Sequence, residues 1–402
     1  MNFLGVHTSR PLPRPFWVLF WGRLVNMVGA SMVFPFLTLY LHHRLHADLT
    51  VVGMVMLAMG ATQVVATSVG GSLSDRWGRR RVMMLSLGGA ALATLAVGLA
   101  RSPSLLVAAL AAQGLIQPLS MPASMAMITD LVPREDLMTA YSLSRVASNA
   151  GIVIGPMLGS LVVGHSYLGL FIGNAVGLMT LAVLTALALP ETRPDTAGQP
   201  AAGGPLTRLA GDGLYWRFLA IWAGIGLVYA QLYLTLPVYM HLDLHLPTAS
   251  FGILAAENAL VVVTTQVLVG SWLSRYNQLA VVGVGTAIYG LGFATFLASA
   301  RLGGLAGSVA FITMGEDFVN PAAMAFVGMR APADMRGRYL GWQSVANRVG
   351  GAVAPLVGGL LLDRGGGPAL WLGTALLATL LAIASWRLGR SALGAAATGQ
   401  TA

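Results

Sequence analysis

Residues 50–100 read TVVGMVMLAMGATQVVATSVGGSLSDRWGRRRVMMLSLGGAALATLAVGLA, and this stretch decides the fold. Two apolar runs, 50–72 and 82–100, flank a short loop that carries one acid and four arginines. A bilayer core about 30 Å thick needs roughly 20 apolar residues per helix, so each run is long enough to cross a membrane. The stretch therefore predicts two membrane-spanning helices joined by a charged turn.

The composition of the whole chain agrees with this reading. Of 402 residues, 56% are hydrophobic and only 9% are charged, whereas soluble domains carry about 25% charged residues. Cysteine is absent, which excludes disulfide frameworks and cysteine-based catalytic or metal sites. The net charge of +9 comes from arginines in short loops between apolar stretches. This placement is typical of a membrane protein and argues against a soluble enzyme or a nucleic-acid-binding protein.

The same window length predicts an all-α integral membrane protein with twelve spans. A linker at 191–213, rich in Pro, Gly and Ala, separates a first bundle (1–190) from a second bundle (214–402). The predicted spans are 15–41, 50–72, 82–100, 104–129, 138–162, 166–189, 214–240, 249–273, 279–299, 304–328, 338–361 and 368–386.

The arginines predict the orientation, because cytoplasmic loops carry an excess of positive charge. If the N-terminus is cytoplasmic, most loop arginines face inward, and only Arg44, Arg101, Arg301 and Arg364 face outward. We therefore expect both termini on the cytoplasmic side of a bacterial inner membrane.

The two halves echo each other at an offset of 199 residues: Pro122 and Pro133 recur as Pro321 and Pro332, and the Gly-Pro pattern of 151–159 recurs at 350–358. Gly and Pro are common in membrane helices, but the shared spacing favours duplication. A parallel repeat predicts two six-helix bundles related by a pseudo-two-fold axis along the membrane normal, with substrate binding near the midplane.

The loop at 71–81 resembles motif A of the major facilitator superfamily. Glycine permits the tight turn, and a carboxylate among guanidiniums forms charge-assisted hydrogen bonds. The resemblance implies a cytoplasmic gate, although the arginines could serve only to hold the loop inside. In the second copy Ser274 replaces the acid. The residues of the implied gate are Gly71, Asp75, Arg76, Gly78 and Arg79, with Asp130 as a partner for one arginine.

The fifth span carries Gly151, Gly155, Pro156 and Gly159, which resemble the end of motif C, the antiporter signature of the same superfamily. Glycines four apart also permit generic close helix packing. Among subfamilies, the twelve-span drug/proton antiporters fit best, in particular their MdtH-like branch. Leu110 stands where many of these antiporters carry an arginine, so proton coupling through that arginine is not implied.

Ionisable residues within membrane spans are costly and mark functional hypotheses. The acids Glu257, Glu316 and Asp317 all lie in the second half. Neighbours on a helix point about 100° apart, so Glu316 and Asp317 cannot both face one cavity. One of the three acids is our candidate proton carrier, unless ion pairing, such as Glu316 with Arg348, locks it.

The first half contributes cations and amides instead. Arg23 and Arg145 either extend to the cytoplasmic headgroups or line the cavity, and with Arg348 they are the intramembrane cations. Further candidates for lining the cavity are Asn26, Gln113, Gln117, Asn149, Tyr229 and Tyr233.

These patterns predict a secondary active transporter that exports lipophilic or cationic small molecules against proton entry. A symporter or facilitator for a small polar metabolite is the main alternative. A chain without lysine has no phosphate-binding G-x-x-x-x-G-K-[ST] loop, and it lacks the motifs of a membrane enzyme. We expect no cofactor, metal or nucleic acid, and a monomer whose partners are substrate, protons and lipid.

Overall fold

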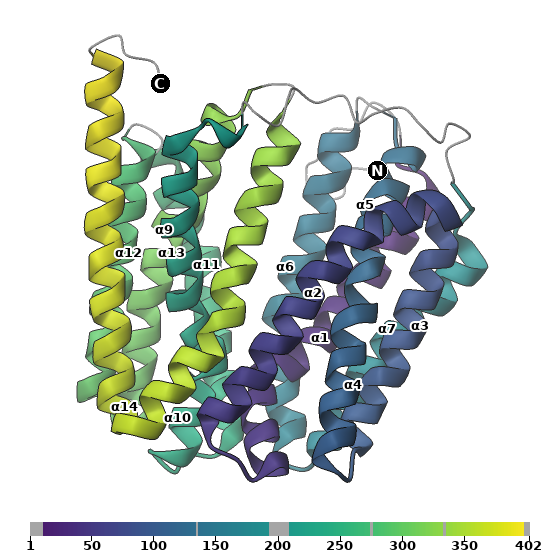
Figure 1. Ribbon diagram of the computed structural model, residues 1–402, viewed down its shortest axis with the longest axis horizontal. Helices are drawn as coiled ribbons and strands as arrows, with labels where there is room; N and C mark the ends of the chain where they lie inside the picture. The colour runs from purple at the N-terminus through teal and green to yellow at the C-terminus, as the bar shows by residue number, and fades with distance from the viewer. Residues whose placement is uncertain (1–10, 134–135, 193–208, 274–275, 333–334, 398–402) are drawn as a thin grey trace. The chain divides into compact units, whose positions relative to one another are not determined.

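The computed structural model describes residues 11–133, 136–192, 209–273, 276–332 and 335–397, and at some helix positions it describes the backbone alone. Every regular element in these ranges is a helix (Figure 1). The chain divides into two compact units: unit 1 holds Met1–Leu45 and Ala58–Gln199, and unit 2 holds His46–Leu57 and Pro200–Ala402. The division near residue 199 falls inside the expected linker. The assignment of residues 46–57 to unit 2 was not expected from the sequence.

Unit 1 is built from long helices joined by short turns. Pro35 lies inside the first helix, whereas Pro118 lies in a single 3-10 turn between two shorter helices. The elements are α1 (Arg14–Leu45), α2 (Leu49–Trp77, whose start belongs to unit 2), α3 (Arg79–Leu99), α4 (Pro103–Ile116), η1 (Gln117–Leu119), α5 (Ser120–Leu131), α6 (Leu137–Val163) and α7 (Tyr167–Ala188).

Unit 2 follows a similar order. Its first span is split before Pro237, and its last helix contains a break at Gly366, where φ is 62°. The elements are α9 (Gly213–Leu234), α10 (Leu236–Leu242), η3 (Thr248–Ser250), α11 (Phe251–Leu273), α12 (Gln278–Thr295), η4 (Phe296–Ala298), α13 (Leu302–Arg330) and α14 (Arg336–Ala397).

Each of the twelve predicted apolar stretches falls on a helical segment. By length and apolarity, nine segments among the described residues qualify as membrane spans. The 54-residue segment Arg338–Ser391 is counted once although it contains the break at Gly366. The all-α membrane fold is therefore confirmed, and the number twelve stays a prediction.

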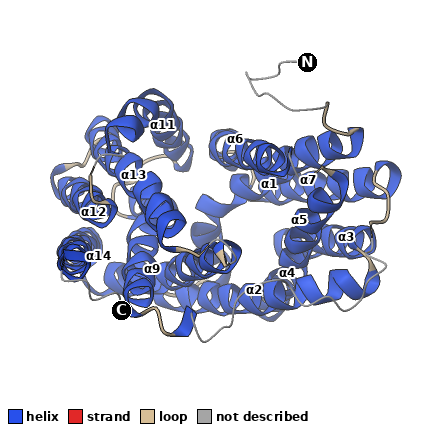
Figure 2. Ribbon diagram, turned by 90° about the horizontal axis from the view of Figure 1, so that it is seen from above, coloured by secondary structure: helices blue, strands red, loops and turns tan. Residues whose placement is uncertain are grey.

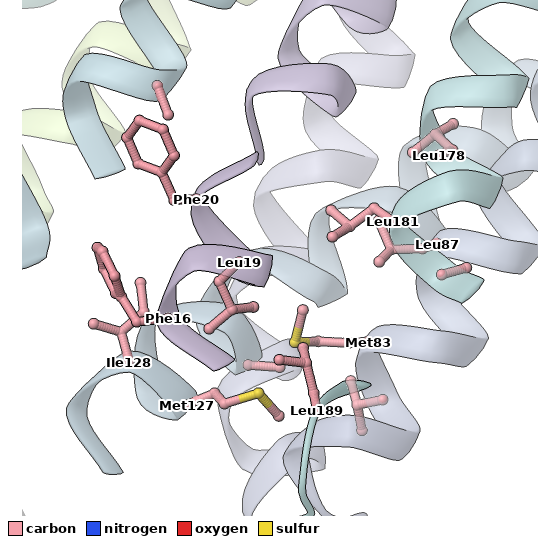
Figure 3. Packing of buried hydrophobic residues seen from close by; sticks show 14 of the residues in the cluster. Phe16, Leu19, Phe20, Met83, Leu87, Met127, Ile128, Leu178, Leu181 and Leu189 are labelled. Carbon is pink, nitrogen blue, oxygen red and sulfur yellow. The ribbon is translucent and has the colours of Figure 1, made fainter. Parts of the chain in front are cut away.

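The core of unit 1 gathers apolar side chains from α1, α3, α5, α6 and α7, many of which Figure 3 draws. Phe16, Met127 and Leu178 have 0% of their surface exposed. Outward-facing leucines such as Leu187, 81% exposed, are what a lipid-facing surface requires. The small fraction of charged residues in the chain therefore suits both the apolar core and the apolar interior of the bilayer.

Glycines set the closest helix contacts in both units. A Cβ atom added at Gly151 of α6 would lie 2.5 Å from Met27 Cβ on α1, and one at Gly159 would lie 2.6 Å from Met32 O. In unit 2, Gly350 and Gly358 of α14 approach α9 in the same way. Figure 2 shows α6 beside α1 in the end-on view. The repeated Gly spacing therefore corresponds to the same close packing of two helices in each unit.

Candidate functional site

The principal candidate site lies in unit 2, where α9, α11 and α13 bring acids and hydroxyls together. Glu316 of α13 accepts a hydrogen bond from Tyr229 Oη of α9, 2.8 Å away. Its other oxygen accepts from Asn320 Nδ2 at 3.2 Å, one helical turn further on. Glu316 is thus held by neutral donors, and no cation among the described residues compensates the charge of its carboxylate.

Asp317, the next residue, points to a different neighbour. Thr265 Oγ1 of α11 donates to Asp317 Oδ2, while Asp317 Oδ1 is buried without a hydrogen-bond partner among the described residues. The residue is only 1% exposed. The angle of about 100° between successive helical residues explains why the two adjacent acids contact different helices.

A chain of neutral hydrogen bonds runs beside these acids. Tyr233 Oη donates to Asn258 Oδ1 at 3.0 Å, and Asn258 Nδ2 donates to Thr313 Oγ1 at 2.7 Å. The rings of Tyr229 and Tyr233 are 5.6 Å apart, and Tyr289 of α12 lies 5.9 Å from Tyr229. The acids are therefore set in an aromatic, hydroxyl-rich environment, to which the two predicted tyrosines belong.

Glu257 lies on α11, one residue before Asn258. Its Oε2 atom is buried and has no hydrogen-bond partner in the described part of the chain. An unpartnered buried carboxylate oxygen is expensive, and such groups call for an explanation such as a bound ion, a water or a functional role. The sequence located all three acids, but the partners of Glu316 and Asp317 became visible only in the structure.

None of the three carboxylates forms an ion pair with any residue that the structure describes. The alternative that Arg348 locks Glu316 is therefore wrong, because Tyr229 and Asn320 occupy that carboxylate instead. Arg348 lies on α14 with an exposed side chain.

Unit 1 carries two of the three predicted intramembrane cations, Arg23 and Arg145. Arg23 Nε of α1 donates to Ser148 Oγ of α6, 2.5 Å away, so this arginine is held inside the unit. Arg145 and Asn149 are exposed on α6. The half-buried arginine and its serine therefore join the same two helices that the glycines bring together.

The predicted amides of unit 1 differ in their surroundings. Gln113 is buried, and its Nε2 donates to Thr94 Oγ1 of α3 at 2.8 Å. It joins α4 to α3, which differs from the expected position facing a cavity. Asn26 Oδ1 is buried without a hydrogen-bond partner among the described residues, and Gln117 is half-buried in η1.

The loop that resembles motif A lies where α2 meets α3. Arg79 Nε is 2.6 Å from Asp130 Oδ2 at the end of α5, so Asp130 does pair with one of the loop arginines. Arg76 is exposed. The side chain of Asp75 and the surroundings of Gly71 lie outside what the structure describes.

Gly78 begins α3 with φ of 96°, a conformation that costs other residues energy. The carboxylate of Glu191, just after α7, covers this glycine, and an added Cβ would lie 2.5 Å from Glu191 Oε2. Glu191 Oε1 also accepts from the backbone N–H of Arg80 at 3.3 Å. A negative charge at a helix N-terminus is favourable. Sequence reasoning missed this role, because 111 residues separate the two partners.

Unit 2 has its own ion pair, which the sequence analysis also missed. Asp212 precedes α9, accepts the backbone N–H of Tyr215 at 3.0 Å and pairs with Arg330 at 2.8 Å. Tyr339 Oη donates to the same carboxylate at 2.9 Å. Burial raises the pKa of Asp212, but the hydrogen bonds and the charge of Arg330 outweigh it and lower the pKa overall. An Asp directly before an apolar run was the available signal.

Similar proteins place this chain in a family. The model of the Major Facilitator Superfamily matches residues 19–263 and 239–400. A Na(+), Li(+), K(+)/H(+) antiporter of Planococcus maritimus is 27% identical over 359 residues, covering 81% of this chain and 84% of that protein. Multidrug resistance protein MdtH of Shigella sonnei (strain Ss046) is 24% identical over 347 residues, covering 85% of each chain.

Solved structures agree with the fold. The nucleoside transporter NupG superposes with a TM-score of 0.77 at 18% identity, covering 93% of this chain and 100% of that chain. A peptide transporter, POT, gives 0.73 at 17% identity, covering 94% and 95%. At these identities the likeness shows the architecture alone. The chain is therefore a multi-pass membrane transporter, not an enzyme, and belongs to the Major Facilitator Superfamily.

Proposed function

We propose that this transporter exports lipophilic, often cationic, small molecules in exchange for protons, and that carboxylates of unit 2 carry the proton. The observation that supports this most directly is that Glu257, Glu316 and Asp317 have no ion-pair partner among the described residues. A carboxylate locked to arginine stays ionised, whereas one without a cation can exchange protons with the solvent.

The neutral groups around the acids suit a lipophilic cation. The aromatic faces of Tyr229 and Tyr233 attract cations by cation–π interactions. An adjacent carboxylate, once deprotonated, adds a full negative charge. Proton and substrate would then compete for one charged group, which is the simplest basis for exchange. The names of two relatives, a cation/proton antiporter and a multidrug resistance protein, are consistent with this proposal.

Transport in proteoliposomes tests it. The purified protein is reconstituted, an imposed pH gradient drives the export of a fluorescent lipophilic cation, and the rate is measured with and without a protonophore. We expect Asp317→Asn or Glu257→Gln to abolish proton-driven transport. Exchange of labelled for unlabelled substrate, which needs no proton, should persist in at least one of these variants.

Asp243→Asn is the matched control, because Asp243 follows α10 and accepts from the backbone N–H of Gly367 at 3.0 Å, away from the acids of α11 and α13. If all three acid variants, including Glu316→Gln, kept the pH dependence of the wild type, proton coupling through unit 2 would be refuted. Substrate and proton moving in the same direction would instead favour a symporter for a small polar metabolite.

A second candidate is exchange of inorganic cations for protons. The relative from Planococcus maritimus is named for Na⁺, Li⁺ and K⁺, and oxygen-rich clusters suit such hard cations. The same proteoliposomes distinguish the two functions. Collapse of the pH gradient on adding NaCl or KCl, without any lipophilic substrate, would support the inorganic ion as the cargo.

We also propose that the chain lies in the bacterial inner membrane with both termini in the cytoplasm, and that the loop before α3 acts as a cytoplasmic gate. The excess of arginines at that face and the Arg79–Asp130 pair support this assignment. Cysteine labelling at Trp77 and Leu99 from either side of the membrane tests the orientation, since both side chains are exposed and the chain has no native cysteine.

A further inference from the structure

A basic pocket lies in unit 1, at the end of α3 that is far from Arg79. It has a volume of about 390 Å³ and is bounded by the ends of α1, α3 and α7. Arg44 and His43 come from the last turn of α1, Leu99 ends α3, and Arg101 follows it. The pocket belongs to no part of the transport site described above.

The wall of the pocket is firmly built. Tyr40 is 4% exposed, and its Oη donates to Val97 O of α3 at 2.7 Å. Its ring lies 5.7 Å from Tyr167 and 4.7 Å from Phe171, both of α7. A Cβ added at Gly98 would lie 2.9 Å from Phe171 Cβ. Three helices are therefore held together at the wall of the pocket, and of the residues that line it only Arg101 lies in a turn between helices.

The charge of the pocket is entirely positive. Arg44 and Arg101 are exposed, and neither forms an ion pair with a described residue. No carboxylate lines the pocket. Two guanidiniums that line one pocket without a counter-ion among the described residues repel each other, so an anion is the ligand that this arrangement favours.

The surroundings indicate where the anion comes from. The pocket lies at the ends of apolar helices, where lipid headgroups meet water, and the apolar side chain of Leu99 in its lining is 58% exposed. With the N-terminus in the cytoplasm, both arginines also fall among the few on the outer face, where membrane proteins place little positive charge. A phosphate bound by the arginines and an acyl chain packed along Leu99 would contact both the charged and the apolar residues of the lining.

We propose that this pocket binds the phosphate group of an anionic phospholipid. The guanidiniums of Arg44 and Arg101 hold the phosphate oxygens, because Arg binds phosphate in a fork of parallel hydrogen bonds. Zwitterionic lipids carry the same phosphate but bring a cation with it, which the two arginines disfavour. The pocket therefore selects lipids by net headgroup charge.

Native mass spectrometry of the full chain tests the selection. The protein is released from mixed micelles that contain phosphatidylglycerol and phosphatidylethanolamine with identical acyl chains, and the ratio of retained lipids is measured. At about 1 kcal/mol per arginine, the Arg44→Gln/Arg101→Gln double variant should lose about thirtyfold of its preference for phosphatidylglycerol. Each single variant should lose about fivefold, which keeps the test available if the double variant fails to fold.

Arg301→Gln is the matched control, because Arg301 is an exposed arginine that precedes α13 in unit 2 and does not line the pocket. Its lipid preference should stay that of the wild type. An unchanged preference in the double variant, or an equal loss in Arg301→Gln, would overturn the proposal. Adding inorganic phosphate at millimolar concentration separates the two sources of the anion. Retention of phosphatidylglycerol supports the lipid, and its displacement would show that the pocket takes the soluble ion instead.

Discussion

Units 1 and 2 use the same close helix packing but differ in the polar side chains that they carry. In unit 1 the glycines of α6 lie against α1, and in unit 2 those of α14 lie against α9. Between the same pairs of helices, unit 1 holds Arg23 bonded to Ser148, while unit 2 joins Gln231 to Ala354 O at 3.0 Å. The acids of unit 2 lie on α11 and α13.

The difference teaches which features a duplication preserves. Close approach of two backbones leaves no room for a Cβ, so the glycines cannot change without separating the helices. A polar side chain at a helix surface meets no such barrier if a partner is at hand. The packing was therefore kept in both units, while the charges were free to diverge.

The ends of the helices show the same divergence. In unit 1, Gly78 begins α3 and Glu191 supplies a remote cap. At the equivalent position in unit 2, Asn277 has a φ of −61°, and its own side chain accepts from Ala280 N at 3.0 Å. One unit uses a long-range contact where the other uses a local one.

The largest expected effect comes from filling the shared packing. Gly350→Val places a side chain against the backbone of Ala223 and Leu227, so we expect a loss of about 3 kcal/mol in the free energy of unfolding. Gly351→Val, at the adjacent residue with open space around it, should cost less than about 1 kcal/mol. Denaturant unfolding in detergent measures both.

Gly151→Val is the corresponding variant in unit 1, and it should lose as much free energy of unfolding as Gly350→Val. Equal free energies of unfolding for Gly350→Val and Gly351→Val would show that the glycine contact does not hold the helices together. A large loss at 350 with none at 151 would mean that the units do not share one packing plan.

The ion pair of unit 2 should have the next largest effect. Arg330→Gln leaves the carboxylate of Asp212, whose side chain is 7% exposed, without its cation, at a cost of about 2 kcal/mol. Because the pKa of Asp212 is lowered in the folded protein, its stabilisation is fully present above the ordinary Asp pKa. It is lost as the pH falls through the lowered value.

The difference in unfolding temperature between wild type and Arg330→Gln should therefore have its largest value at pH 7 and become smaller in acid. Thermal unfolding across that pH range measures it. Arg330→Lys keeps the charge and should recover part of the loss. A difference that stayed constant with pH would contradict the assigned role of Asp212.

A double-mutant cycle sharpens the contrast between the two caps. Gly78→Ala should cost about 2 kcal/mol, because alanine disfavours a φ of 96° and its Cβ meets Glu191. In a Glu191→Ala background the steric part disappears while the backbone strain remains, so the cost should fall but not vanish. A cost independent of Glu191 would show that conformation alone requires this glycine.

The smallest expected effect concerns residues 49–57, the start of α2, which belong to unit 2. Asp363 accepts the N–H groups of Leu49 and Thr50 at 3.2 and 2.7 Å and so caps α2. The equivalent residue in unit 1 is Gly164, which has no carboxylate. Asp363→Gly should cost about 1 kcal/mol and speed hydrogen exchange in residues 49–57, as measured by mass spectrometry. Asp363→Asn, which keeps an acceptor, should lose less, and unchanged exchange in the glycine variant would refute the cap.

The sequence predicted the site only in part. The rarity of charge within apolar spans identified Glu257, Glu316 and Asp317, because burying a charge is costly enough to stand out residue by residue. It could not find the contact of Glu316 with Tyr229, since Tyr229 lies 87 residues earlier in the chain. Gln113 was misjudged for a related reason: an amide within a span suits a cavity and a bond to Thr94 equally well.

Local patterns along the chain were enough to determine the membrane-embedded, all-helical fold and its duplication, because span length and glycine spacing are read within a few turns of helix. The tertiary structure alone decided which acids remain without a cation, which carboxylates cap distant helices, and where residues 46–57 pack. Those outcomes depend on residues far apart in the chain meeting in space, and no periodicity in the sequence records such a meeting.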